Sequence, residues 1–256
     1  MIDSHCHINQ YDDPLSIAQE CEIEGIITIA MTNLPSEFED AFSWVRRYKR
    51  IRLSLGLHPL LAKYHQKELP IFERLIDKTS YIGEVGLDFS RQGKGTEKIQ
   101  LESLTRVFEL LKNKTRFVSI HSRNAESMVI DLMNQHNVRG AVLHWYSGSI
   151  QNLDKAVALG NYLSINTSMI GSKNGQKIIA RIPPDRLLTE TDGPFIKVHN
   201  RPVRPTDISM IYDYLAQTWG IGRADVEKQV KANFMTIITK LRNNGTIPHG
   251  GLVSPK

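Results

Sequence analysis

The chain begins MIDSHCHI (residues 1–8), and this stretch decides the fold. On a β-strand, side chains alternate between the two faces, so Asp3, His5 and His7 share one face and Cys6 lies on the other. Two imidazoles and a carboxylate on one face can form half of a metal site, whereas Cys6 is expected to pack in the interior. An isolated H-x-H pattern is as typical of packed histidines as of metal ligands, so the interpretation depends on the rest of the chain.

Short β-rich runs alternate with amphipathic helical patterns downstream of this first strand. Predicted strands cover residues 1–6, 25–31, 51–57, 81–87, 116–121, 140–145, 162–165 and 187–189. Predicted helices cover residues 14–24, 35–48, 68–77, 97–111, 125–136 and 150–159, and the seventh unit is interrupted at 171–175. Strands that alternate with helices predict a parallel sheet, and eight such units predict a (β/α)8 TIM-type barrel. The length of 256 residues is close to the roughly 250 typical of one such barrel.

Two more helices are expected after the barrel, over residues 206–219 and 224–241. The domain prediction is therefore a single hydrolase barrel over residues 1–242. Residues 243–256, which contain NNG, PHGG and SP, are predicted to form a flexible C-terminal tail.

Composition limits the class of protein. Hydrophobic residues make up 41% and charged residues 23%, which excludes a disordered chain. Two cysteines, Cys6 and Cys21, are too few for a disulfide framework, and the first residues carry no signal-peptide pattern. No apolar run approaches the ~18 residues of a membrane span. We therefore expect a soluble cytoplasmic protein with no membrane partner, and the net charge of +5 is a mild indication of polyanionic partners.

Potential ligands follow the predicted strands at their carboxyl ends, where (β/α)8 barrels carry their active sites. They are Glu84 and Asp88 in GEVGLD, His121 in VSIH, His144 in VLH, Asp192 in TETDGP and His58 in GLHP. Each histidine alone would more often be a packed residue. Their convergence with the first strand predicts a metal site, which includes Asp3 as well as His5 and His7.

Four histidines lie outside this pattern. We expect His65, His136 and His249 to be surface or loop residues, and we do not expect His199, in the loop after the eighth strand, to contact substrate.

These motifs carry a resemblance to a known family. The series DSHCH, GLHP, GEVGLD, IHSR, HWYSGS and ETDGP, in this order and spacing, resembles the TatD-type DNases of the amidohydrolase superfamily over residues 1–241. The resemblance implies a binuclear centre in which His5, His7 and Asp192 hold one metal. It further implies that His121 and His144 hold the second metal and that Glu84 bridges the two. Several relatives bridge their metals with a carbamylated lysine, whereas a carboxylate needs no modification.

A two-metal site suggests the roles of individual residues. Two divalent ions (Mg, Mn or Zn) can stabilise the attacking and leaving oxygens of a displacement at phosphorus. Catalytic roles are expected for Asp192 as proton acceptor, for the bridging Glu84 and for His58. His58 would contact a phosphate oxygen or protonate the leaving group; it could equally be a turn histidine before Pro59. Glu190 is expected to orient a ligand or to be a buried partner.

Basic and aromatic residues occur in the loops at the strand ends. They favour a nucleic-acid substrate over the alternative that these charges form an ordinary solvated rim. We call the following nine residues the rim cations: Arg91, Lys94, Lys98, Arg123, Lys173, Lys177, Lys197, Arg201 and Arg204. Phe89, Trp145, Tyr146 and Phe195 occur at the same strand ends and could stack on bases. Arg91, Arg123, Arg204 and Trp145 are predicted to bind DNA. A separate basic run at 46–52 lies on the opposite face; it is expected to be a solvated helix end, with a partner or nucleic-acid patch as the alternative.

Some motifs depart from the usual family pattern. After ETDGPF the usual Asn-x-Pro element is missing, and WY stands where CF is frequent. The combination of LGLHP, LHWYSGS and TETDGPF resembles the QatD group, the TatD-like proteins of the Qat anti-phage defence systems. That resemblance implies other Qat defence proteins as partners.

Three classes of function remain open from the sequence. The first is a metal-dependent DNase, acting on single strands or as an exonuclease. The second is an amidohydrolase acting on a small cyclic amide or ester, against which the basic loops and Glu84 argue. The third is a non-catalytic component of a defence complex. The intact ligand set argues against that class, because facing buried carboxylates are costly without a cation.

Overall fold

A parallel barrel forms the centre of the protein in a computed structural model, which describes residues 1–243. Its strands are β1 (Ile2–Cys6), β2 (Ile27–Ala30), β3 (Ile51–Leu53), β4 (Leu55–Leu57), β5 (Tyr81–Gly86), β6 (Phe117–His121), β7 (Val142–Leu143), β8 (Tyr162–Ile165) and β9 (Leu187–Thr189). Each pairs in parallel with the next along the barrel, except at the junction of β3 and β4. The predicted (β/α)8 fold is confirmed.

The third predicted strand, 51–57, is divided at Ser54 into β3 and β4. Its first half pairs with β2 and its second half pairs with β5. The Thr32 hydroxyl lies at the division, where it donates to the Ser54 carbonyl (2.9 Å) and accepts from the Gly56 amide (3.0 Å). A side chain thus replaces part of the regular ladder, and a pattern of apolar residues could not reveal this.

The barrel closes between its first and last strands. The amide of Asp192 donates to the carbonyl of His5 (2.9 Å), and the amide of His7 donates to the carbonyl of Gly193 (2.8 Å). The Ser4 hydroxyl also donates to the Thr189 carbonyl (3.0 Å). Closure therefore brings the end of β1 directly against the residues that follow β9.

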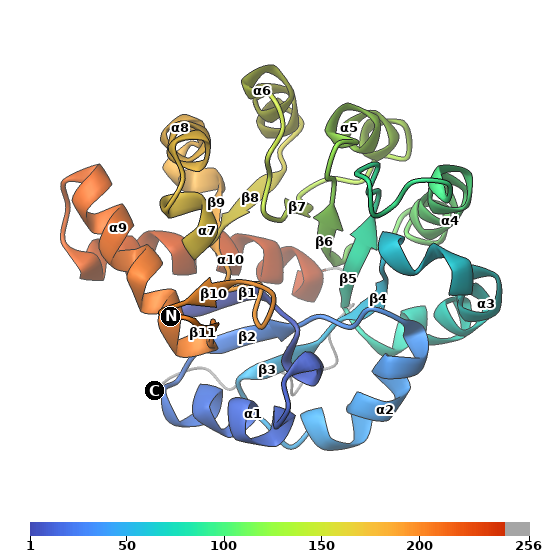
Figure 1. The fold of residues 1–256 in the computed structure, drawn as a ribbon, viewed down its shortest axis with the longest axis horizontal. Coiled ribbons are helices and arrows are strands. Elements are labelled where there is room, and N and C mark those ends of the chain that lie inside the picture. The colour runs from blue at the N-terminus through green and yellow to red at the C-terminus, as the bar shows by residue number, and fades with distance from the viewer. Residues whose placement is uncertain (244–256) are drawn as a thin grey trace.

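Helices surround the strands, most of them in a ring (Figure 1). They are α1 (Pro14–Ile23), α2 (Pro35–Val45), α3 (His65–Leu75), α4 (Glu97–Leu110), α5 (Glu126–Gln135), α6 (Ile150–Ala158), α7 (Thr167–Ile170), α8 (Lys173–Arg181), α9 (Ser209–Trp219) and α10 (Arg223–Asn243). The interrupted seventh unit resolves into two helices, because Asn166 and Ser172 cap α7 and α8 separately.

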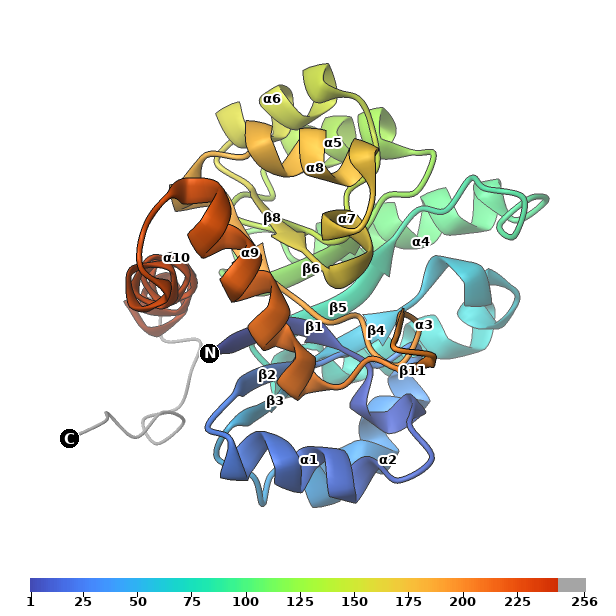
Figure 2. The same cartoon turned by 60° about the vertical axis from the view of Figure 1, so that its left-hand side comes forward.

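Two features at the end of the chain complete the fold. A two-stranded antiparallel hairpin, β10 (Lys197–Val198) and β11 (Arg201–Pro202), was not predicted; it lies beside the carboxyl ends of the barrel strands. Helix α10 lies at the opposite end, next to the N-terminus (Figure 2). The predicted tail starts at the last residue of α10, and the rest of it, 244–256, lies outside the described residues.

Most of the interior is one large apolar cluster in which both cysteines are buried and free, as the sequence predicts for Cys6. A smaller cluster of Ile196, Val198 and Val203 lies beside it. Within the described part of the chain, no helix is both long enough and apolar enough to span a membrane.

Candidate metal centre

Histidine and carboxylate side chains from separate strands meet at the carboxyl end of the barrel. His5 and His7 come from β1 and the residue after it, Glu84 from β5 and His121 from β6. His144 directly follows β7, and Asp192 lies three residues beyond β9. Apart from His121, which is partly buried, all of them are buried. The structure therefore brings together the six residues that the family resemblance implies as ligands.

Glu84 lies at the centre of this cluster, and its two oxygens face different histidines. Oε1 lies 2.6 Å from Nδ1 of His121 and 2.7 Å from Nε2 of His144. Oε2 lies 3.2 Å from Nε2 of His7 and 3.5 Å from Nε2 of His5. One carboxylate therefore connects two separate pairs of imidazoles.

The pair from β1 converges with Asp192 on the other side of Glu84. Nε2 of His5 lies 3.1 Å from Nε2 of His7. Oδ1 of Asp192 lies 3.5 Å from the first nitrogen and 3.7 Å from the second. The positive φ of 50° at Asp192 turns the chain sharply at this point.

His121 is held at both ring nitrogens. Its Nδ1 faces Glu84, and its Nε2 lies 2.8 Å from Oδ2 of Asp88, which is fully buried. The other oxygen of Asp88 accepts from the amide of Ser90 (2.8 Å). The sequence counted Asp88 among the potential ligands, but none of the potential metal-binding groups among the described residues includes it, and it contacts His121 instead.

Similar partners fix His5 and His144. Nδ1 of His5 lies 2.8 Å from the hydroxyl of Ser119, a contact that the sequence did not reveal. Glu190 is fully buried, accepts from the Trp145 amide (3.0 Å), and lies 3.7 Å from Nδ1 of His144. Glu190 is therefore a buried partner beside the cluster, as one of the two expectations had it.

Asp3 does not join the cluster, contrary to expectation. It is fully buried, and both of its oxygens are occupied by Thr191: Oδ1 accepts from the amide (2.9 Å) and Oδ2 from the hydroxyl (2.6 Å). None of the potential metal-binding groups among the described residues includes it. Asp3 instead connects β1 to the segment that carries Asp192.

His58 combines a turn contact with a position beside the cluster. Its Nε2 is 3.2 Å from Oε2 of Glu84, while its Nδ1 accepts from the amide of Leu60 (3.1 Å). The prediction that His65 is a surface residue is wrong: it is 2% exposed, and its Nε2 lies 3.0 Å from the carbonyl of His58. His65 is thus a buried support for the segment that carries His58.

Burial and the nearby charges shift the pKa values of the residues in this centre in opposite directions. Burial, together with His144, lowers the pKa of His5 to about 3. Burial and the nearby Glu84 raise the pKa of Asp192 well above its ordinary value, against the opposing effect of His144. Although burial disfavours the carboxylate, His58, His144 and His121 hold the pKa of Glu84 well below its usual range. The centre therefore combines an ionised Glu84 with imidazoles of two kinds: the pKa is lowered at His5 and His7 and raised at His121 and His144.

The donor set fits divalent cations. Three overlapping groups have ligand atoms close enough for one ion: His5 with His144 and Asp192, His5 with His7 and Glu84, and His58 with Glu84 and His121. The close approach of the His5 and His7 nitrogens presents two basic atoms to the same point, which a cation would stabilise. Imidazole with carboxylate suits zinc or manganese, and carboxylate alone suits magnesium.

A cavity of about 780 Å³ opens above the cluster. His58, His121, His144 and Asp192 reach its base, and Arg123, Trp145 and Phe195 are also in its lining. Phe195 is 57% exposed and packs edge-on against His7, with ring centroids 4.9 Å apart. This cavity is large enough for a nucleotide-sized group.

Two of the predicted stacking aromatics lie elsewhere. Tyr146 is 1% exposed, and its hydroxyl donates to the Ser149 carbonyl (2.6 Å), so it is a core residue and cannot stack on a base. Phe89 is partly buried against the core and is not in the lining of the cavity.

The rim cations differ in their ion pairs and hydrogen bonds. Arg123 is exposed, and its side chain donates to the Gln92 side chain (3.3 Å). Arg91 is exposed and has no partner among the described residues. Arg204 pairs with Glu20 of α1 and is absent from the cavity lining, while Arg201 pairs with Asp207 (2.7 Å). The structure therefore places Arg123 at the cavity and holds Arg204 away from it.

The remaining histidines lie outside the site. His199 is exposed in the turn of the β10–β11 hairpin, with a φ of 51°. His136 is a partly buried loop residue after α5, and His249 lies beyond the described residues.

Comparison with known proteins shows where this arrangement belongs. The profile of the family described as TatD related DNase matches residues 2–239. The chain is 30% identical to human deoxyribonuclease TATDN3 over 268 residues, covering 95% of this chain and 96% of the human protein. It is 29% identical over 219 residues to the 3'-5' ssDNA/RNA exonuclease TatD of Cronobacter sakazakii, covering 80% and 83%.

A solved structure gives the same fold. The TatD homologue YJJV of Escherichia coli superimposes with a TM-score of 0.81 at 23% identity, covering 93% of this chain and 97% of that one. Fold, ligand cluster and sequence similarity agree over nearly the whole described chain. The chain belongs to the TatD-related DNase family and is a TatD-type metal-dependent hydrolase.

Proposed function

We propose that this protein hydrolyses phosphodiester bonds of DNA at a centre for two divalent metal ions, acting on single strands or from a strand end. The observation that carries the proposal is the position of Glu84, whose two oxygens face separate histidine pairs at the base of an open cavity. A single-metal hydrolase would not need a shared carboxylate between two such pairs.

The geometry suggests how the ligands divide. His5, His7 and Asp192 would hold one cation, His121 and His144 would hold the other, and Glu84 would bridge them. His58 lies near enough to Glu84 to be an additional ligand or a substrate contact. Two divalent ions at such a centre lower the pKa of bound water and stabilise charge on the attacking and leaving oxygens.

The chain's own residues would orient the substrate and transfer protons. Asp192, buried beside His5 and His7, is placed to accept a proton from the attacking water. His58 lines the cavity with its Nε2 directed at the cluster, so it could contact a phosphate oxygen or protonate the leaving oxygen. Asp88 and Ser119 would hold the histidines in the orientation that the reaction needs.

Residues at the mouth of the cavity support a nucleic-acid substrate. Arg123 and Trp145 are in its lining, and Arg91 lies on the same loop as Gln92, the partner of Arg123. Cations attract the phosphates, and exposed aromatic faces stack on unpaired bases. Arg204 would take part only if its ion pair with Glu20 opened. The relative from Cronobacter sakazakii, named as a 3'-5' exonuclease of single-stranded DNA and RNA, supports the choice of single strands.

The LGLHP, LHWYSGS and TETDGPF motifs extend this proposal to anti-phage defence. They resemble the QatD group, so the protein would work beside other Qat proteins. Co-purification of tagged chain with the proteins of its own operon tests this part, and an absence of any co-purifying operon product would contradict it.

A substrate panel tests the activity. End-labelled single- and double-stranded DNA and RNA are incubated with protein in Mg²⁺, Mn²⁺ or Zn²⁺, with EDTA as the control. We expect metal-dependent release of nucleotides from single-stranded DNA. Hydrolysis of small cyclic amides or esters without any cleavage of nucleic acid would favour the amidohydrolase alternative.

A further inference from the structure

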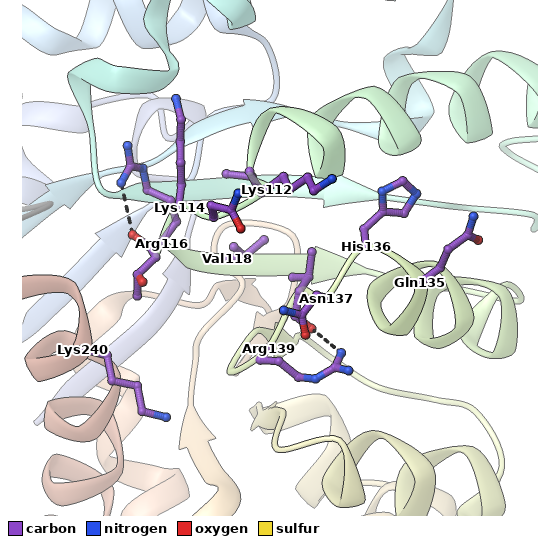
Figure 3. Close-up of a pocket in the computed structure, with 13 residues that line it drawn as sticks. Lys112, Lys114, Arg116, Val118, Gln135, His136, Asn137, Arg139 and Lys240 are labelled. Carbon is purple, nitrogen blue, oxygen red and sulfur yellow. Dashed lines mark hydrogen bonds between the residues drawn. The ribbon is translucent and has the colours of Figure 1, made fainter. Parts of the chain in front are cut away.

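A second cavity, of about 600 Å³, is shown in Figure 3. It lies at the amino ends of β6 and β7, the opposite end of the barrel from the metal centre. Its walls come from the loop between α4 and β6, the loop between α5 and β7, and the end of α10. Val118 of β6 lies between these walls. The volume is within the roughly 300–1,000 Å³ of small-ligand sites.

Permanent cations dominate its lining. They are Lys112, Lys114 and Arg116 from the first loop, Arg139 from the second, and Lys240 from α10. No aspartate or glutamate among the described residues is in the lining. The carboxylate of Asp77, outside the cavity, pairs with Lys114 (2.7 Å) and Arg116 (3.0 Å), so one negative charge offsets two of the five cations.

The other three cations have no carboxylate partner in the described part of the chain. Lys112 and Lys240 are exposed. Arg139 is exposed and donates to neutral oxygens, those of the Asn134 side chain (2.9 Å) and the Val138 carbonyl (3.3 Å). Like charges from three distant chain segments therefore line one cavity, and their mutual repulsion favours the binding of an anion there.

Two side chains of the lining also have unused hydrogen-bonding atoms. The Arg116 side chain is only 9% exposed, and its Nε has no partner among the described residues. Nε2 of His136 is likewise buried and unpaired within them. Buried polar atoms without partners are costly in folded proteins, so a water or a bound group that reached these two atoms would stabilise this wall of the cavity.

We propose that this cavity binds a compact polyphosphate group, that of a nucleoside triphosphate or of inorganic oligophosphate. Several phosphates carry the charge that uncompensated cations attract, and guanidinium and ammonium groups are their usual donors. The concave wall built from three segments fits a compact ligand. An extended nucleic acid would instead follow a continuous basic track, and the run at 46–52 is absent from this lining.

Binding is measured by isothermal titration of the full chain at low salt in EDTA, which keeps divalent cations away from the metal centre. The probes are adenosine triphosphate, inorganic tripolyphosphate, adenosine, and single-stranded oligonucleotides of two lengths. The test variant is Arg139→Ala with Lys240→Ala, both exposed. The control variant, Lys67→Ala with Lys228→Ala, loses the same number of positive charges at two exposed residues outside the cavity.

We expect each triphosphate to bind the wild-type protein and the control variant with affinities within twofold of each other. We expect each to bind the test variant at least about tenfold more weakly. Equal affinities for the two triphosphates would mean that phosphate alone is recognised, and tighter binding of adenosine triphosphate would add a nucleoside contact. No binding to wild-type protein, or unchanged binding to the test variant, would overturn the proposal. So would oligonucleotides that displace tripolyphosphate with affinity rising with their length.

Discussion

Nε2 of His121 lies 2.8 Å from Oδ2 of Asp88, on the side of the ring opposite to Glu84. Asp88 is fully buried and is itself held by the amide of Ser90. The carboxylate therefore fixes which nitrogen of His121 faces the metal centre. Such partners usually orient the ligand and increase its basicity.

Asp88→Asn should weaken metal binding and activity about 10–100-fold, because the shape is kept but the charge that orients His121 is lost. Titration of metal-free protein with Mn²⁺ measures the affinity directly. Asp154→Asn, which removes an exposed carboxylate that pairs with Arg181, is the matched control and should leave the affinity unchanged. Equal affinities in all three proteins would mean that Asp88 is merely structural.

Replacement of Glu84 by alanine should abolish hydrolysis and remove most of the bound metal, because both histidine pairs lose the carboxylate they share. His5→Ala and Asp192→Ala should have the same effect. Metal content by mass spectrometry, measured together with nuclease activity, checks this. Glu73→Ala, an exposed carboxylate on α3, is the control. Normal turnover in any two of the three ligand variants would contradict the assignment.

Charge reversal at the cavity mouth should separate Arg123 from Arg204. Arg123→Glu should weaken binding of single-stranded DNA and lower the salt slope by roughly 0.7 per lost phosphate contact. Arg204→Glu should have the smaller effect, since that side chain pairs with Glu20 outside the cavity. Fluorescence anisotropy across a salt series measures both quantities. An equal loss of DNA binding in the two variants would indicate that the overall positive charge attracts the DNA, without a local phosphate contact by Arg123.

Gly86 should not tolerate a side chain. A Cβ at Gly86, where φ is 151°, would lie 2.0 Å from the carbonyl oxygen of His121. At Gly95, where φ is 87°, a Cβ would meet nothing within 4 Å. Backbone strain of about 1–3 kcal/mol is common to both alanine variants, and the clash adds to it at Gly86 alone. Chemical denaturation should therefore show a clearly larger loss of stability for Gly86→Ala, and equal losses would contradict the close approach of β5 and β6.

The sequence predicted the barrel because alternating β and α patterns report directly on burial. The ligand positions could also be predicted, because β1, β5, β6, β7 and β9 each carry a ligand within three residues of the last residue of the strand. The pattern could not show which partner each side chain on a shared face contacts. Asp3 shares the face of His5, but Thr191 is within reach and occupies its carboxylate.

Tertiary contacts explain the other differences. Tyr146 follows a strand end like Trp145, yet packing against the core removes it from the cavity. His65 looked like a surface residue because its neighbours are polar, but Ser103 of α4 and the carbonyl of His58 satisfy both of its nitrogens. The β10–β11 hairpin was missed because its turn, His199–Asn200, has no glycine. Partners distant in sequence determine each of these features.

The variant Asp192→Asn tests whether the Glu84 cluster cleaves DNA. Asparagine keeps the shape and an oxygen ligand but removes the negative charge and the base. Binding and cleavage of a labelled single-stranded oligonucleotide are measured across a salt series, in Mn²⁺, with metal content checked in the same samples. We predict that the variant binds DNA at least as tightly as wild-type protein, with the same salt dependence, and cleaves it about 10²–10⁴-fold more slowly. Metal-loaded wild-type protein and variant that neither bind nor cleave DNA at low salt would contradict the account.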